Sequence, residues 1–363
     1  MPQKQPNKVG VVRFSALGDV VLTIPVLYDA CVANPDVQFV MITRKAFVGL
    51  FINTPSNLTV RGIDLKKDYK GMGGMMRLAA ELDVDTFIDL HSVLRTWMID
   101  ARLRMRGVRV VVFDKARKEK RNLVKKGAAK SGVISHVTER YADAFLNAGL
   151  ALKSEFRGLF AEKPADSSLF ASLHSPKKEE QLWIGVAPFA AHKGKVYPID
   201  LIYKAIKAMV EDNPDAKVFL FGGGETETAI LRRYAEEATP NKVFCVAGSK
   251  IGFGGELALM ASLDVMVCMD SGNMHMAAIA GARTVSIWGA THPAAGFGPW
   301  CPAGKPKDWH RTLQVPRICR PCSVFGNKPC KYLEESSIPP CMSAIDPLSI
   351  TFAALDINKK PII

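Results

Sequence analysis

The sequence predicts an α/β protein built from two doubly wound, Rossmann-like domains, and three observations support this. The chain has 363 residues, which suits two domains of ordinary size. Short apolar segments alternate with helical patterns through both halves, as in parallel sheets covered by helices on both faces. A polar, turn-rich stretch over residues 162–180 separates the two halves and is interpreted as a linker.

The elements of the two domains follow in order along the chain. In a first domain over residues 1–165, strands are expected at 9–14, 38–43, 58–63, 86–90 and 108–113, with an apolar helix over 20–32. In a second domain over residues 180–345, strands are expected at 182–186, 217–221, 243–246, 264–269 and 284–288. Residues 346–363 are expected to form a C-terminal helix and tail, capped by Asp346 and with Pro347 in its first turn.

The composition is that of a globular protein. Hydrophobic residues make up 48% of the chain and charged residues 23%, which excludes wholesale disorder. The longest purely apolar runs fall far short of the ~20 residues that cross a bilayer, and the N-terminal pattern does not match a secretory signal. We therefore expect a cytoplasmic protein whose eight cysteines are free thiols or metal ligands rather than disulfides.

Positive charge is concentrated in one segment. The net charge is +13, and residues 102–130 hold 12 basic residues against the two acidic residues Asp114 and Glu119. A surplus of this size favours an anionic partner over a merely solvated face. Phe113 is the only aromatic residue within this segment and no nucleic-acid-binding module is recognisable, so a phosphorylated or acidic lipid headgroup fits better than nucleic acid.

Ligands of open α/β sheets bind at the carboxyl ends of the strands, so the loops there carry the chemistry. The first such loop, residues 15–19, has neither G-x-G-x-x-G nor G-x-x-x-x-G-K-[ST], which argues against a dehydrogenase and a P-loop NTPase. Its Asp19 stands at the start of a helix. It is either a general base or a carboxylate that stabilises the helix dipole.

Two loops of the second domain suit a nucleotide. Lys193 and Lys195 precede a helix, where a cation can bind phosphate or form part of an exposed basic loop. The glycines at 222–224 allow close approach of the backbone to a ligand, and Glu225 after them suits ribose hydroxyls.

A fourth loop opens another helix of the second domain. The N–H groups at Ser271 and Gly272 suit a pyrophosphate, and His275 in the first turn adds a donor. The alternative is that Asp270 or Ser271 caps the helix.

These motifs together resemble one family. The elements concerned are Ser15-Ala16-Leu17-Gly18-Asp19 with Thr23-Ile24-Pro25, Lys195-x-Tyr197-Pro198, Gly224-Glu225, Asp270-Ser271-Gly272-x-x-His275 and Trp288-Gly289-Ala290-Thr291. In this order, from about Val9 to Pro347, they resemble the ADP-heptose:lipopolysaccharide heptosyltransferases of glycosyltransferase family nine. The resemblance implies a GT-B fold, with two Rossmann-like domains facing across a cleft. It also implies inverting sugar transfer from a nucleotide diphosphate, most often ADP-heptose, without a required metal ion or other cofactor.

The resemblance also implies a role for each site residue. Asp19 is the expected base on the acceptor hydroxyl, and Lys195, with Lys193 as its competitor, is the expected cation on the leaving diphosphate. Glu225 is expected at the ribose and Asp270 at the sugar. The diphosphate is expected at Ser271, Gly272 and His275.

The resemblance implies an anionic glycolipid acceptor, the lipid A–core of lipopolysaccharide, which the basic segment would meet. The protein is then expected at the cytoplasmic face of the inner membrane. Alternatives are a transferase that uses another nucleotide sugar and a catalytically silent protein that binds a sugar nucleotide or glycolipid. The presence of both Asp19 and Lys195 favours the enzyme.

Four cysteines close to the C-terminus have partly zinc-like spacing: Cys319, Cys322, Cys330 and Cys341. Free thiols are the favoured interpretation, and a four-thiolate zinc site is the alternative.

Overall fold

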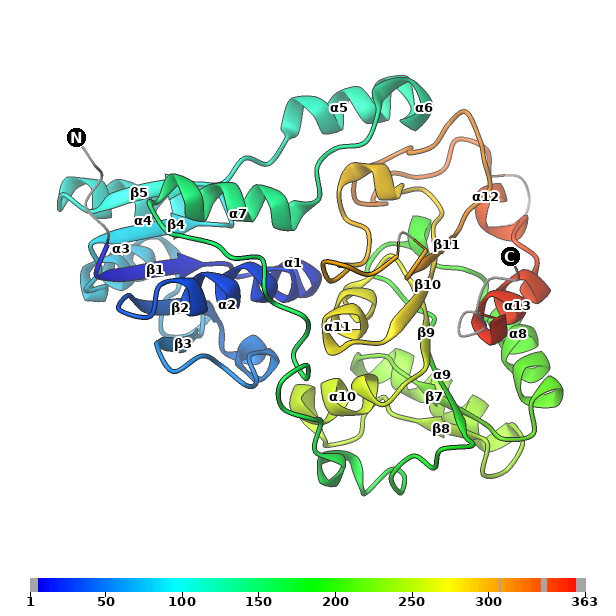
Figure 1. Ribbon diagram of the computed structural model, residues 1–363. Coiled ribbons are helices and arrows are strands. Elements are labelled where there is room, and N and C mark those ends of the chain that lie inside the picture. The colour runs from blue at the N-terminus through cyan, green and yellow to red at the C-terminus, as the bar shows by residue number, and fades with distance from the viewer. Residues whose placement is uncertain (1–5, 307, 334–337, 357–363) are drawn as a thin grey trace. The chain divides into compact units, whose positions relative to one another are not determined.

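Two parallel β-sheets, each covered by helices, organise the chain (Figure 1). The computed structural model describes residues 6–306, 308–333 and 338–356. The chain divides into unit 1, Met1–Arg117 with Ser135–Arg157, and unit 2, Lys118–Ile134 with Gly158–Ile363. Of the expected C-terminal tail, residues 357–363 lie outside the described part.

Unit 1 is a five-stranded sheet in the order β3-β2-β1-β4-β5, with every neighbouring pair parallel. Its strands are β1 (Lys8–Val12), β2 (Gln38–Arg44), β3 (Leu58–Ile63), β4 (Thr86–Asp89) and β5 (Arg109–Val112). Its helices are α1 (Leu17–Val21), α2 (Ile24–Ala33), α3 (Gly71–Glu81), α4 (Leu94–Met105) and α7 (Val137–Asn147). Val12 and Phe87 pack with α3 and α4 on one face, and α2 contacts α7 on the other.

The apolar stretch predicted as one helix over residues 20–32 is two helices. Helix α1 starts at Leu17 and ends at Val21, and α2 starts at Ile24 with Pro25 in its first turn. Proline has no N–H to continue the hydrogen-bond ladder of α1, so the chain restarts there. The consequence for the site is that Asp19 lies in the first turn of a short separate helix.

Unit 2 is a six-stranded parallel sheet in the order β11-β10-β9-β6-β7-β8. Its strands are β6 (Leu182–Ala187), β7 (Ala216–Leu220), β8 (Val243–Cys245), β9 (Val265–Met269), β10 (Arg283–Ile287) and β11 (Arg311–Leu313). Its helices include α8 (Ile199–Asp212), α9 (Gly224–Glu237), α10 (Gly252–Ala261), α11 (Gly272–Ala280), α12 (Pro340–Ser343) and α13 (Pro347–Asp356). Ile206 of α8 and Ile350 of α13 pack on one face of the sheet.

The C-terminal helix is a part of unit 2. Asp346 Oδ1 accepts the N–H of Leu348 at 3.0 Å, and α13 begins at Pro347. The Thr351 hydroxyl donates to the carbonyl of Ala205 in α8 at 3.1 Å. The cap and the start of this helix are therefore where the sequence pattern places them.

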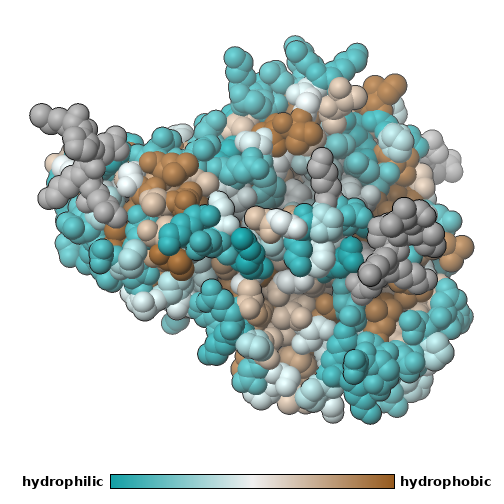
Figure 2. Space-filling model, in the orientation of Figure 1, coloured by the Kyte–Doolittle hydropathy of each residue, from teal (hydrophilic) through white to brown (hydrophobic). Residues whose placement is uncertain are grey.

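The basic segment is divided between the units, which differs from its placement in the first domain by the sequence analysis. Helices α5 (Arg117–Lys126) and α6 (Ala128–Ser131) lie mainly in the part that packs with unit 2. The Lys120 ammonium lies 4.3 Å from the centroid of the Phe297 ring, and Ile134 donates to the carbonyl of Ala294 at 2.9 Å. Because of these tertiary contacts, residues 118–134 belong to unit 2 and not to unit 1. Figure 2 shows hydrophilic side chains over α5 and α6.

Within the described residues, no helix combines the length and the apolar character needed to cross a membrane.

Candidate functional site

In unit 1, Asp19 is the candidate base, and it is held by only one of its two oxygens. Oδ2 pairs with the Arg13 guanidinium at 2.6 Å and accepts the N–H of Ala16 at 3.2 Å. The second contact is the helix-start interaction that the sequence offers as an alternative to a base, whereas the sequence does not indicate the pairing with Arg13. Among the described residues, Oδ1 has no hydrogen-bond partner and is not buried. This leaves one oxygen of Asp19 available for a substrate.

Arg13 is the buried member of this pair. Its side chain is 9% exposed, against 24% for Asp19, and it also donates to the carbonyl of Leu90 beyond the end of β4. A guanidinium can make two such contacts at once because its donors form a planar fork. Arg13 therefore fixes the loop after β1 to the loop after β4.

The loop after β4 is built on a buried carboxylate. Asp89 Oδ1 accepts the N–H groups of His91 at 2.7 Å and Ser92 at 2.8 Å. Asp100 of α4 is buried beside Asp89, and burial together with that neighbouring charge raises the pKa of Asp100 well above its ordinary range. Asp100 therefore keeps its proton in the folded protein to a higher pH than an ordinary aspartate does.

A cavity of about 700 Å³ lies at the carboxyl ends of the strands of unit 1. Residues from the ends of β1, β2, β3 and β4 line it, as expected for a ligand site of an open parallel sheet. Ser15, from the loop that leads to Asp19, is among them. The cationic lining residues are Arg44, Lys45, Lys66 and Arg95, against the single carboxylate Asp64. This lining suits an anionic ligand.

In unit 2, Lys195 pairs with Asp270. Lys195 Nζ lies 2.9 Å from Asp270 Oδ2, and the same oxygen accepts the Thr291 hydroxyl at 2.7 Å. Asp270 follows β9, Thr291 follows β10, and Lys195 comes from the loop after β6. These three strands are neighbours in the sheet. Their carboxyl ends therefore place Asp270 and Thr291 next to Lys195, although they follow it by 75 and 96 residues in the sequence.

The loop that carries Lys195 is packed closely on its neighbours. Gly194 accepts the N–H of Ala290 at 2.8 Å. Gly326 has φ +74, and a Cβ built on it would lie 2.7 Å from Lys195 Cγ. Lys193, in contrast, is exposed to solvent. The structure thus separates the two lysines that the sequence leaves in competition.

Helix α11 begins beside Asp270. Ser271 is its N-cap residue but makes no side-chain capping bond, and the Ser271 Oγ is buried without a hydrogen-bond partner in the described structure. Gly272 opens the helix, and His275 lies in its first turn with 5% of its surface exposed. Four backbone N–H groups at such a helix start have no partner within the helix and favour an anion.

Glu225 lies in the first turn of α9, after the glycine turn, and is exposed. The neighbouring Glu227 is engaged, since its Oε2 accepts the N–H of Gly223 at 2.9 Å. Glu225 is therefore the less constrained of the two carboxylates.

The sequence indicates no role for Arg13 or His91, and it marks Thr291 only as part of the motif Trp288-Gly289-Ala290-Thr291. Arg13 sits inside a run predicted as buried strand, where a charged residue needs a partner, and that is the signal that could have found it. His91 and Thr291 each follow a predicted strand by one to three residues, which is the position that the carboxyl-end rule marks.

Within the described residues, the four cysteines near the C-terminus are not gathered into a metal-binding cluster. Cys319, Cys322, Cys330 and Cys341 all lie within the described residues and are free thiols. In that part of the chain, no three His, Cys, Asp or Glu side chains are arranged to hold a metal ion.

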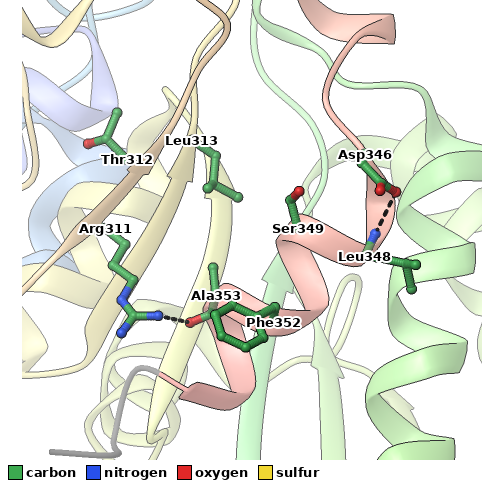
Figure 3. Close-up of a pocket in the computed structure, with 8 residues that line it drawn as sticks. All are labelled: Arg311, Thr312, Leu313, Asp346, Leu348, Ser349, Phe352 and Ala353. Carbon is green, nitrogen blue, oxygen red and sulfur yellow. Dashed lines mark hydrogen bonds between the residues drawn. The ribbon is translucent and has the colours of Figure 1, made fainter. Parts of the chain in front are cut away.

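A further cavity of about 590 Å³ in unit 2 lies between β11 and α13 (Figure 3). Arg311 reaches across to the carbonyl of Ala353 at 3.4 Å and pairs with Asp356 at 3.2 Å. None of the candidate site residues lines this cavity. Its Arg311 ties β11 to the C-terminal helix.

Comparison with known proteins agrees with this layout. The family model for glycosyltransferase family 9 (heptosyltransferase) matches residues 85–305. Lipopolysaccharide heptosyltransferase 1 of Campylobacter coli is 21% identical over 309 residues, covering 78% of this chain and 84% of that protein.

Solved structures share the fold over nearly the whole chain. The glycosyl transferase family 9 protein of Veillonella parvula has a TM-score of 0.70 at 18% identity and covers 97% of both chains. E. coli ADP-heptose lps heptosyltransferase II has a TM-score of 0.67 at 15% identity, covering 96% of this chain and 98% of that one. E. coli heptosyltransferase WaaC with ADP has a TM-score of 0.60 at 16% identity, covering 87% and 96%.

The family model spans more than half of the chain, and both units are parallel α/β sheets as in the heptosyltransferase structures. The chain is therefore a glycosyltransferase of the GT-B fold and belongs to glycosyltransferase family 9, the heptosyltransferases.

Proposed function

We propose that the protein transfers heptose from ADP-heptose to an anionic saccharide of the lipopolysaccharide inner core, with inversion at the anomeric carbon. The observation that carries the proposal is the partly exposed Asp19 carboxylate, held through Oδ2 with Oδ1 uncommitted. It follows Ser15, which lines the cationic cavity, by four positions. The relatives add support, since their names specify lipopolysaccharide, heptose and ADP.

On the acceptor side, Asp19 is the base. An acceptor hydroxyl gives its proton to Asp19 Oδ1 while its oxygen bonds to the anomeric carbon of the heptose. The bond from that carbon to the diphosphate oxygen breaks, and ADP leaves with the electron pair. Arg13 keeps the carboxylate in place during this step, because it holds Oδ2 and is itself anchored to Leu90.

On the donor side, Lys195 and the start of α11 stabilise the departing ADP. The lysine has three N–H donors and Asp270 occupies one of them. Backbone N–H groups at Gly272 and the buried hydroxyl of Ser271 suit the phosphate oxygens. Glu225 binds the ribose hydroxyls, and His275 supports the diphosphate from the first turn of α11.

The acceptor is anionic in this proposal because the cavity of unit 1 carries Arg44, Lys45, Lys66 and Arg95. Helices α5 and α6 of unit 2 add an exposed basic surface (Figure 2). We propose that this surface holds the protein at the anionic cytoplasmic face of the inner membrane, where a glycolipid acceptor would lie.

The test begins with the donor. Purified protein is screened by thermal shift against ADP-, UDP-, GDP- and CMP-sugars, and stabilisation by ADP-heptose alone is expected. Transfer to a heptose-free lipid A–core glycolipid is then followed by mass spectrometry, with a mass increase of one heptose expected. Stabilisation by ADP-heptose without any transfer would support the catalytically silent alternative. Stabilisation by another nucleotide sugar instead would overturn the assignment of ADP-heptose as the donor.

A further inference from the structure

His91 is a titratable group at the candidate acceptor site that the mechanism above does not use. It follows β4 and lines the cationic cavity of unit 1 together with Phe14 and Ser15. A histidine in that place is a natural competitor of Asp19 for the role of base. The hydrogen bonds around the ring decide between a base and a donor.

The ring is held in one tautomer. His91 Nδ1 accepts the backbone N–H of Phe14 at 3.1 Å, so Nδ1 carries no proton and the proton of the neutral ring is on Nε2. The His91 backbone N–H donates to Asp89 Oδ1 at 2.7 Å, which fixes the residue from the other side. Among the described residues, Nε2 has no hydrogen-bond partner and is not a buried polar atom.

The charges around the ring keep it neutral. Burial is the largest effect, and the cations Arg13, Lys115 and Arg95 act in the same direction, so that the pKa of His91 falls to about 3. Asp19 is the one neighbouring carboxylate that opposes this. A neutral ring whose free nitrogen already carries a proton cannot take the proton of an acceptor hydroxyl, so Asp19 has no competitor in His91.

We propose that the Nε2–H of His91 is a fixed neutral hydrogen-bond donor to an oxygen of the acceptor saccharide, and that it orients the acceptor in the cavity of unit 1. This inference rests on the proposed function, because it takes the cavity as the acceptor site. The cations around the cavity attract an anion from any direction. The Nε2–H of His91, in contrast, points in one direction because Phe14 and Asp89 hold the residue, so it sets the orientation of the bound sugar.

Two variants separate the donor from the structural contact. The amide oxygen in His91→Asn takes approximately the place of Nδ1, so it keeps the bond to Phe14 and loses the donor. The amide nitrogen in His91→Gln takes approximately the place of Nε2, so it keeps the donor and loses the bond to Phe14. We expect His91→Asn to raise the acceptor KM about three- to tenfold, the effect of one neutral hydrogen bond, with an unchanged KM for ADP-heptose.

The kinetic test varies a heptose-free lipid A–core glycolipid at saturating ADP-heptose. His91→Gln is expected to keep an acceptor KM closer to that of the original protein than His91→Asn does. An unchanged acceptor KM in His91→Asn would overturn the proposal. Equal losses in both variants would also overturn it, because they would show only a structural role. Thermal unfolding of both variants checks that each is folded.

A second measurement does not depend on turnover. Long-range ¹H–¹⁵N NMR of the histidine rings in the full chain reports the tautomer, and the His91 signal is identified by its absence from the variants. We expect protonated Nε2 and unprotonated Nδ1 from pH 5 to pH 8, and a shift of the Nε2 signal on adding the glycolipid. Titration of His91 within that range, or no shift, would overturn the inference. If the protein transfers no sugar, the proposed function fails, while this spectrum still decides the role of His91.

Discussion

Each unit places a carboxylate–cation pair at the carboxyl ends of its strands. The two pairs differ in which member, the carboxylate or the cation, is the more exposed to solvent. In unit 1 the cation Arg13 is 9% exposed and the carboxylate Asp19 is 24% exposed. In unit 2 the cation Lys195 is 15% exposed and the carboxylate Asp270 is 8% exposed. Unit 1 therefore presents a carboxylate and unit 2 presents a cation.

The buried member of each pair is also hydrogen-bonded to the loop that follows a neighbouring strand. Arg13 donates to the Leu90 carbonyl, and Asp270 accepts the Thr291 hydroxyl. A buried charge that is paired and hydrogen-bonded holds its partner in one place. We therefore propose that the more exposed member of each pair reacts or binds, while the buried member positions it.

The largest effect is expected from substituting Asp19, the more exposed member of the pair in unit 1. Asp19→Asn keeps the shape and removes the base, so kcat for transfer is expected to fall about 10²- to 10⁴-fold. Binding of ADP, measured by calorimetry, is expected to stay unchanged, since the substitution lies in the other unit. Asp83→Asn, a change to an exposed carboxylate of unit 1, serves as the control. Turnover at the original rate in Asp19→Asn would remove the base from the mechanism.

The second largest effect is expected at Lys195, the more exposed member of the pair in unit 2. Lys195→Met removes one charge-assisted contact to the diphosphate, worth about 1.5–3 kcal/mol, so the Kd for ADP is expected to rise about 10- to 100-fold. The matched control is Lys193→Met, because Lys193 lies two residues away and is exposed. If Lys193→Met weakened ADP binding as much as Lys195→Met, the pairing with Asp270 would not mark the diphosphate site.

A third prediction concerns Asp100, which is buried beside Asp89 at the loop to which Arg13 is anchored. The raised pKa of Asp100 means that the folded protein holds a proton that the unfolded chain loses above about pH 4. Unfolding therefore becomes more favourable as the pH rises from there towards the raised pKa. Asp100→Asn cannot ionise, so its Tm relative to the original protein is expected to increase from pH 5 to pH 8.

The control for this effect is Asp143→Asn, a change to an exposed carboxylate of α7. Its Tm difference from the original protein is expected to be the same at both pH values. A constant difference for Asp100→Asn as well would mean that Asp100 does not hold the extra proton in the folded protein.

The smallest effect is expected from the anchor in unit 2. Thr291→Val removes the 2.7 Å hydrogen bond to Asp270, and one such bond contributes about 0.5–1.5 kcal/mol. The kcat/KM for ADP-heptose is expected to fall about three- to tenfold because Asp270 no longer holds Lys195 firmly. Thr312→Val, at an exposed position of β11, is the control and should leave kcat/KM unchanged.

Much of the fold could be predicted from the sequence, because the pattern is local. The strands at 58–63 and 182–186 follow from short apolar runs between turn residues, and the observed strands begin at the same residues. The helix capped by Asp346 likewise follows from residues that are adjacent in the chain. The division between α1 and α2 also had a local signal, Pro25, which the apolar pattern concealed.

The segment 118–134 shows where local pattern fails. Its sequence follows directly on a strand of unit 1, yet Leu123 is buried and Lys120 lies on Phe297, far along the chain in unit 2. Six of the twelve basic residues of the segment 102–130 lie on each side of the boundary after Arg117. No periodicity within the segment specifies which unit its apolar face meets.

The sequence by itself determined two parallel α/β units and the loops at which ligands are expected, since the apolar period and the glycine turns are properties of neighbouring residues. It also selected Asp19, Lys195, Glu225 and Asp270 as the side chains of interest. Only the tertiary structure decided which residues pair, because Arg13 with Asp19 and Lys195 with Asp270 meet through the order of strands in a sheet. The tertiary structure also decided which partner of each pair is buried, and burial is a property of everything packed around a charge.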